Sequence, residues 1–207
     1  MKRNFTEKES VKRAFIIDCA LRTISENGSF NVTMDDIAKS AGLSKGGLNH
    51  YFSSKDELFE ATFQEYFDRI FARSQERINS FSDPLDKLLS FDWLFNWEDQ
   101  DVNIGYPLLF DCHALAVRNA TYRRIFHEWV ERWVNMLRVA VSEGIEKGIF
   151  PKVDPEDTAR CISAIYHGFA TRWYLDKEGH STKWAIEYYR RTITGLIKGM
   201  GGEDIAG

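Results

Sequence analysis

The segment from residue 33 to residue 52 constrains the fold more than any other part of the chain. It contains two short helical patterns separated by Gly42, a residue that permits a sharp turn. Ile37 of the first pattern faces the same core as Leu48 and Phe52. Leu48 lies in the second helical pattern, and Phe52 follows four residues later, just after that pattern ends. The segment therefore predicts a helix-turn-helix, whose second helix has the size and shape to enter the major groove of DNA.

Start and stop signals predict helices along the rest of the chain. Thr6 with Glu9 forms a capping box, and Pro84 and Pro155 each follow an Asp that can cap a helix. Gly28 ends the first helix, because glycine adopts the left-handed conformation after a last turn. We expect an all-α fold of about nine helices. Their predicted ranges are 7–27, 34–41, 45–51, 55–80, 84–97, 104–118, 120–147, 155–176 and 182–199.

Charge is distributed unevenly between two predicted domains. Residues 1–55 hold 9 Lys and Arg against 6 Asp and Glu, a net +3, whereas residues 56–207 carry a net −7. A basic excess beside a helix-turn-helix suits contact with phosphate. We expect a DNA-binding domain over residues 1–54 and a ligand-binding and dimerisation domain over residues 55–207, with the helix at 55–80 as a shared connector.

Several classes of protein are disfavoured by what the sequence lacks. No apolar stretch is long enough to span a membrane, and the first residues have no apolar leader, so a cytoplasmic protein is expected. Three widely spaced cysteines favour neither a disulfide framework nor a metal site. No motif of a catalytic site is present, and Cys112 and His113, being adjacent on a helix, point in different directions. We therefore expect no enzymatic activity, no metal and no cofactor.

The second helix of the helix-turn-helix carries side chains suited to DNA. Ser44 is its predicted N-cap, Lys45 can reach a phosphate or a guanine edge, and Gly47 allows the backbone to approach the groove. Asn49 can form two hydrogen bonds with adenine. The predicted DNA-binding residues are Thr33, Ser44, Lys45, Gly46, Gly47, Asn49, His50, Tyr51 and Lys55.

Residues 6–60 resemble the N-terminal domain of the TetR/AcrR family of bacterial regulators. The resemblance is carried by four motifs, namely Asn27-Gly28-Ser29-Phe30, Thr33-Met34-Asp35-Asp36-Ile37-Ala38, Ala41-Gly42-Leu43-Ser44-Lys45-Gly46 and His50-Tyr51-Phe52-x-Ser54-Lys55-Asp56-Glu57-Leu58. It implies an all-helical homodimer that binds a palindromic operator and releases it when a small molecule binds. It also implies phosphate contacts from Thr33, Tyr51 and Lys55, and base or groove contacts from Lys45, Gly47 and Asn49.

Two positions depart from the family pattern. Members commonly have Thr, Ser or Ala at the position of Gly47, and Tyr at the position of Asn49. These departures leave an alternative open: a helical protein that binds a small molecule or a protein partner and whose helix-turn-helix no longer engages DNA. A repressor is the favoured interpretation, with activation as the other mode of regulation.

Aromatic residues concentrate in the middle of the chain and predict an effector pocket. Pockets for small apolar ligands are lined by such side chains with a few polar groups. Packing within a core is the competing interpretation. Acidic groups beside aromatic rings, with Asp92, Glu98 and Asp111 as candidates, would also suit a cationic effector. The predicted ligand-binding residues are Phe91, Trp93, Phe95, Tyr106, Phe110, Asp111, His113, Phe126, Trp129, Trp133 and His167.

The last two predicted helices have the composition of a homodimer interface, where large aromatic side chains are enriched. A dimer places two recognition helices ~34–36 Å apart, in successive major grooves. Packing inside one subunit is again the competing interpretation. The predicted interface residues are Ile162, Ile165, Tyr166, Phe169, Trp173, Trp184, Tyr188, Ile193 and Leu196.

Overall fold

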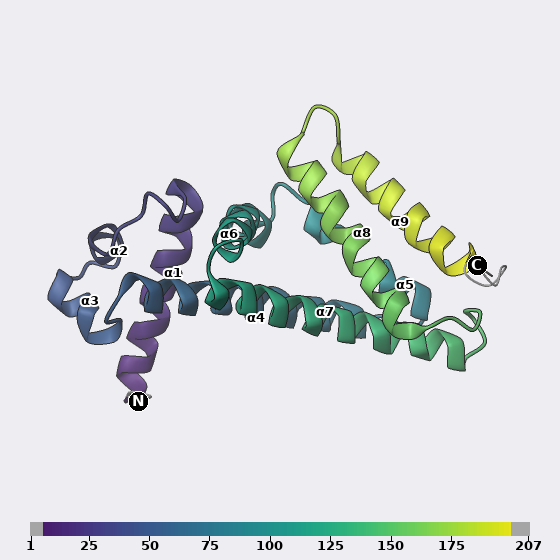
Figure 1. Ribbon diagram of the computed structural model, residues 1–207, viewed down its shortest axis with the longest axis horizontal. Coiled ribbons are helices and arrows are strands. Elements are labelled where there is room, and N and C mark those ends of the chain that lie inside the picture. Colours follow the sequence, from purple (N-terminus) through teal and green to yellow (C-terminus); the bar gives the residue numbers. More distant parts are fainter. Residues whose placement is uncertain (1–5, 200–207) are drawn as a thin grey trace. The chain divides into compact units, whose positions relative to one another are not determined.

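The computed structural model describes residues 6–199, which form nine α-helices and one short 3₁₀ helix without any strand (Figure 1). The all-α prediction is confirmed. The elements are α1 (Glu7–Asn27), α2 (Met34–Ser40), α3 (Lys45–Tyr51), α4 (Lys55–Asn79), α5 (Pro84–Leu88), η1 (Asp92–Phe95), α6 (Gln100–Ala116), α7 (Ala120–Glu146), α8 (Pro155–Leu175) and α9 (Thr182–Gly199). No helix in this part of the chain combines the length and the apolar character needed to cross a membrane.

The chain divides into two compact units that do not follow the linear order of the sequence. Of the described residues, the first unit contains 6–69 together with Asn103–His127, and the second contains Ile70–Val102 together with 128–199. Helices α4, α6 and α7 therefore contribute residues to both units. The sequence predicted a division after residue 54, with the helix at 55–80 shared.

The N-terminal helices begin where the sequence predicts. Thr6 accepts the backbone N–H of Glu9 while the Glu9 carboxylate accepts the backbone N–H of Thr6, and Thr33 and Asp36 form the same reciprocal box at α2. The Ser44 side chain caps α3. These local hydrogen bonds satisfy N–H groups that the first turn of a helix leaves without a partner.

The helix predicted at 84–97 is broken, and long-range hydrogen bonds account for the break. Helix α5 ends at Leu88 and η1 begins only at Asp92. The Tyr166 hydroxyl donates to the carbonyl of Leu88 at 2.6 Å. The single hydrogen of the Tyr189 hydroxyl is shared between the carbonyl of Leu89, at 3.0 Å, and Asp92. Because these carbonyls already have partners, the chain can leave the helix without leaving buried polar groups unsatisfied.

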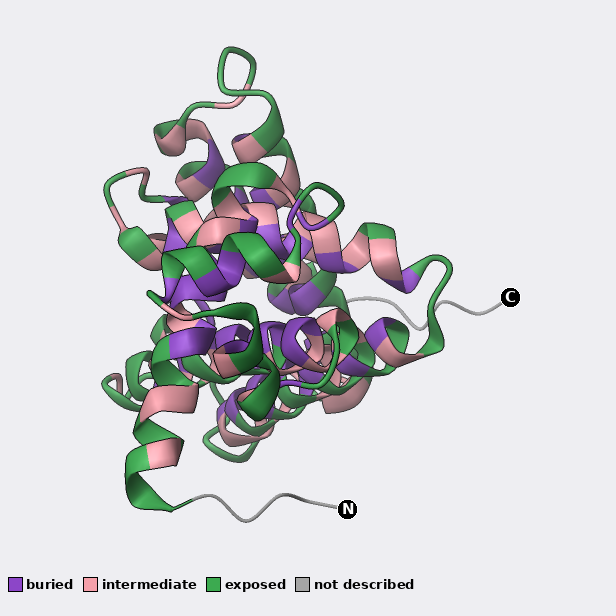
Figure 2. Cartoon of the chain, turned by 90° about the vertical axis from the view of Figure 1, so that its left-hand side faces the viewer, coloured by how far each residue is buried: buried purple, intermediate pink, exposed green. Residues whose placement is uncertain are grey.

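Helices α8 and α9 pack against each other (Figure 1) and contain many buried residues of the second unit. Buried residues are purple in Figure 2. Four residues predicted for the dimer interface have almost no exposed surface: Ile162, Tyr166, Trp173 and Ile193. Their side chains fill the core of their own subunit, which corrects the prediction for these positions. The five other predicted interface residues keep exposed surface: Ile165, Phe169, Trp184, Tyr188 and Leu196.

Candidate DNA interface and effector site

Helix α3 is held in place by its apolar face rather than by its helix propensity. It has only 7 residues, two of which are the unfavourable glycines Gly46 and Gly47. Leu48 and the following Phe52 both have 0% exposure, so they anchor the helix in the core of the first unit. The opposite face, with Lys45 and Asn49, is left exposed.

The structure gathers the nine predicted DNA-binding residues in the first unit. None of them is buried. Thr33, Ser44, Lys45, Gly46, Asn49 and His50 are exposed, and Gly47, Tyr51 and Lys55 are partly exposed.

Two residues predicted to contact DNA pair with acidic side chains in the protein without DNA. Lys45 Nζ lies 3.2 Å from Asp35 Oδ2, and His50 Nε2 lies 3.1 Å from Glu9 Oε1. Hydrogen bonds from the Thr6 backbone and from His50 lower the pKa of Glu9 to about 2. Exposed pairs of this kind contribute little free energy, so a DNA phosphate can replace the carboxylate in each. Neither pairing follows from a local sequence pattern, because the partners lie 10 and 41 positions apart.

Lys55 is held by a backbone carbonyl of the turn after α1. Its Nζ donates to the carbonyl of Ser29 at 3.0 Å and lies 4.8 Å from the centre of the Phe59 ring. Hydrogen bonds from Thr33 lower the pKa of Asp36, and the charge of Lys55 contributes to that shift. The charge of Lys55 is therefore felt at the start of α2, where Thr33, another predicted phosphate contact, lies.

The predicted effector residues fall into two groups. Phe91, Trp93, Phe95, Trp129, Trp133 and His167 belong to the second unit, whereas Tyr106, Phe110, Asp111, His113 and Phe126 belong to the first. Ring contacts connect members of each group. In the second unit the Phe91 and Trp133 rings are 4.9 Å apart, and the Trp129 and His167 rings are 5.2 Å apart.

In the first unit the His113 and Phe126 rings meet edge to face at 4.5 Å. Burial lowers the pKa of His113 and raises the pKa of the Cys112 thiol to about 12. A thiol with that pKa is protonated at neutral pH and is not an activated nucleophile. Within residues 6–199, no group of three or more His, Cys, Asp or Glu side chains is placed to hold a metal ion.

Two of the three acids proposed to attract a cationic effector already have strong partners. Asp92 accepts hydrogen bonds from the Arg190 guanidinium at 2.7 and 2.9 Å and from the Tyr189 hydroxyl. Asp111 accepts the backbone N–H of Ser29 at 2.5 Å. Glu98 is exposed. Asp92 and Asp111 are therefore less available to a cationic effector than their sequence positions suggested.

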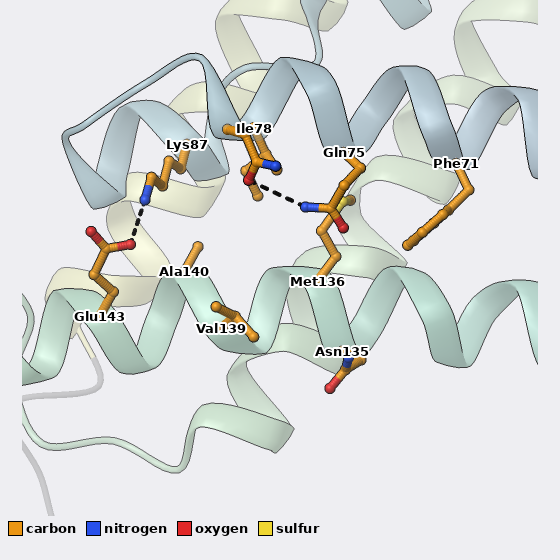
Figure 3. Close-up of a pocket in the computed structure, with 10 residues that line it drawn as sticks. Phe71, Gln75, Ile78, Lys87, Asn135, Met136, Val139, Ala140 and Glu143 are labelled. Carbon is orange, nitrogen blue, oxygen red and sulfur yellow. Dashed lines mark hydrogen bonds and ion pairs between the residues drawn. The ribbon is translucent and has the colours of Figure 1, made fainter.

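A small pocket of about 120 Å³ lies in the second unit between α4, α5 and α7 (Figure 3). The ion pair between Lys87 and Glu143 closes one side, and the amide of Gln75 and the side chain of Met136 lie farther along. None of the predicted effector residues lines this pocket. Its walls come from helices distant in sequence, so no local pattern indicated it.

Comparison with known proteins identifies both halves of the chain. Residues 16–62 match the model of bacterial regulatory proteins of the tetR family, and residues 98–198 match the C-terminal domain of BetI-type transcriptional repressors. The HTH-type transcriptional regulator BetI of Agrobacterium fabrum is 39% identical over 167 residues, which are 81% of this chain and 79% of that protein. The chain belongs to the TetR family.

Solved structures of transcriptional regulators share the fold. A TetR transcription regulator from Haloarcula marismortui superimposes with a TM-score of 0.75 at 25% identity, covering 92% of this chain and 98% of that one. A putative transcriptional regulator from Saccharomonospora viridis, solved in complex with choline, gives a TM-score of 0.81 at 20% identity, covering 89% and 96%. TetR-family proteins are ligand-responsive transcriptional regulators that bind DNA operators as dimers, and the family is not enzymatic.

Proposed function

We propose that this TetR-family regulator represses transcription by reading a palindromic operator with the exposed face of α3. The observation that carries the proposal is the division of α3 into a buried face, Leu48, and an exposed face that presents Lys45 and Asn49. Asn49 reads an adenine, and Lys45 contacts a guanine or a phosphate. Thr33, Tyr51 and Lys55 contact phosphates on either side. Such a protein acts in the cytoplasm, where the DNA is, and carries out no catalysis.

Selection of duplexes from a random pool, followed by gel-shift titration, tests this function. We expect a palindromic site with two half-sites one helical turn apart. Asn49→Ala is expected to reduce the discrimination between bases by about 1–3 kcal/mol at one base pair of each half-site, so that other bases are accepted there. Asn135→Ala, which removes an exposed amide from α7, is the matched control and leaves the site unchanged. If no sequence is selected with or without effectors, the alternative of a helix-turn-helix that does not bind DNA is favoured.

We propose that the dimer forms through the exposed parts of α8 and α9. The rings of Phe169 and Trp184 lie 5.2 Å apart, and those of Trp184 and Tyr188 lie 5.5 Å apart. These rings join residues of both helices into one partly exposed aromatic strip, the type of surface that homodimers bury. Phe169→Glu is expected to yield monomers in light scattering, and Val117→Glu, at an exposed apolar position of the first unit, to leave the dimer intact.

We propose a small apolar or aromatic effector, bound by the aromatic residues of the C-terminal half. The similarity to BetI-type repressors and to a protein solved with choline makes a quaternary ammonium compound the first one to test. Thermal shift with choline and with 3,3-dimethylbutan-1-ol, its uncharged analogue of the same shape, isolates the role of the charge. A larger shift with choline supports recognition by aromatic faces. Equal shifts support a purely apolar site.

A further inference from the structure

Asp111 of α6 makes a contact that its predicted role as an effector ligand does not explain. Its Oδ2 accepts the backbone N–H of Ser29 at 2.5 Å, although the two residues are 82 positions apart. Ser29 lies in the turn after α1 and is only 2% exposed. A buried N–H needs a partner, and a charged acceptor gives one of the stronger hydrogen bonds in a protein. The Asp111 carboxylate therefore fixes the position of this turn.

The other side of Ser29 is held by Lys55. The Ser29 carbonyl accepts a hydrogen bond from Lys55 Nζ at 3.0 Å. The backbone of Ser29 is thus held on both sides, by the Asp111 carboxylate at its N–H and by the Lys55 ammonium group at its carbonyl. A lysine ammonium has three donors, so Lys55 can keep its bond to Ser29 and donate to a DNA phosphate at the same time.

We propose that Asp111 is a positioning residue for operator binding, which acts through Ser29 to place the Lys55 ammonium where it meets a phosphate. This inference rests on the proposed phosphate contact of Lys55. It removes Asp111 from the predicted effector site and gives it a part in DNA binding, although it does not touch DNA. A movement of α6 that withdraws the carboxylate would free the turn and leave Lys55 without its support.

For Asp111→Ala, a long-range electrostatic effect and a positioning effect predict opposite changes in operator affinity. Removing a negative charge from a DNA-binding protein strengthens its attraction to phosphate in general. If Asp111 positions Lys55, however, Asp111→Ala weakens operator binding, and we expect about a tenfold rise in Kd, equivalent to the loss of one such contact. Glu146→Ala removes the same charge from an exposed site on α7 and is the matched control. We expect it to bind as tightly as the unchanged protein, or slightly more tightly.

The experiment is a double-mutant cycle read by fluorescence anisotropy on the selected operator duplex over a range of salt concentrations. Lys55→Gln is expected to reduce the slope of log K against log salt by about 1 per subunit, as for one lost phosphate contact. Asp111→Ala should reduce the slope in the same way, and the double variant should bind no more weakly than Lys55→Gln alone. A purely structural role for Asp111 would lower thermal stability without changing the salt slope.

The outcomes separate the two proposals. If Lys55→Gln leaves both affinity and salt slope unchanged, the phosphate contact itself is wrong and the inference fails with it. If Lys55→Gln weakens binding but Asp111→Ala does not, or if their effects simply add, only the inference is overturned. Should circular dichroism show that Asp111→Ala is unfolded, Asp111→Asn takes its place in the cycle. The neutral amide keeps an acceptor for the Ser29 N–H, so we expect Asp111→Asn to reduce operator affinity less than Asp111→Ala would. This reduction should vanish when Lys55→Gln is also present. A reduction that adds to that of Lys55→Gln overturns the inference.

Discussion

Gly105 of α6 lies against the ring of Tyr66 in α4 so closely that a β-carbon at position 105 would overlap the phenol. Tyr66 is only 8% exposed, so its ring has little room to move aside. The absence of a side chain at Gly105 is therefore what allows α6 to approach α4 at this point.

We predict that Gly105→Ala destabilises the protein although alanine is the better helix former. Forcing extra volume into a packed contact typically costs about 1–3 kcal/mol, which exceeds the gain in helix propensity of up to about 1 kcal/mol. Urea unfolding measures the difference. Gly46→Ala, at a helical glycine with open space around it, is the control and should be neutral or stabilising. Equal stabilisation by both substitutions would show that Tyr66 does not restrict α6.

Two adjacent tyrosines of α9 provide a matched test of the bonds at the end of α5. Tyr189 is fully buried and its hydroxyl bonds to the Leu89 carbonyl and to Asp92, whereas Tyr188 is 40% exposed. Tyr189→Phe removes a hydrogen bond from the carbonyl of the buried Leu89 and from the partly exposed Asp92 carboxylate, so we expect a loss of about 1–3 kcal/mol. Tyr188→Phe should change stability little. Thermal unfolding of the two variants checks this, and equal effects would contradict a role of the hydroxyl in supporting the break.

The recognition helix should accept a side chain at Gly47. A β-carbon there would be 3.4 Å from Ser44 Oγ and 3.7 Å from the nearest Leu43 carbon, which are ordinary contacts. We predict that Gly47→Ala stabilises the protein by about 0.5–1 kcal/mol, because alanine favours the helix. The new methyl group would also change base preference, which repeated selection of duplexes measures. An unchanged preference would place position 47 outside the groove.

The parts of the fold that the sequence predicted depend on local interactions. The capping box at Thr6 and the Asp154 cap with its following proline involve residues within three or four positions, and both appear in the structure. The break between Leu88 and Asp92 depends instead on Tyr166 and Tyr189, which lie 78 and 100 positions from the carbonyls they bond. A helical pattern alone contains no information about such partners.

The candidate site shows the same limit. Periodicity predicted correctly that Leu48 and Phe52 are buried, which leaves Asn49 on the outer face of α3. It did not predict that Asp111 bonds to Ser29, because an acidic residue among aromatic ones looks the same in sequence whether it contacts a ligand or a backbone N–H. Trp173 was predicted to lie in the dimer interface but is buried in the core of its own subunit. Helical spacing does not distinguish these two locations.

His113 should make the stability of the protein fall at mildly acidic pH. Burial lowers its pKa in the folded state, whereas in the unfolded chain the imidazole titrates at its ordinary value of about 6.5. As pH falls below that value, the unfolded state takes up a proton that the folded state does not, so the free energy of unfolding decreases. Urea unfolding at pH 7.5 and 5.5 measures the loss, and His113→Gln should reduce it. In His127→Gln, which removes an exposed imidazole from α7, the loss should persist. If both variants respond to pH as the unchanged protein does, the partly buried His113 imidazole is not the source of the acid sensitivity.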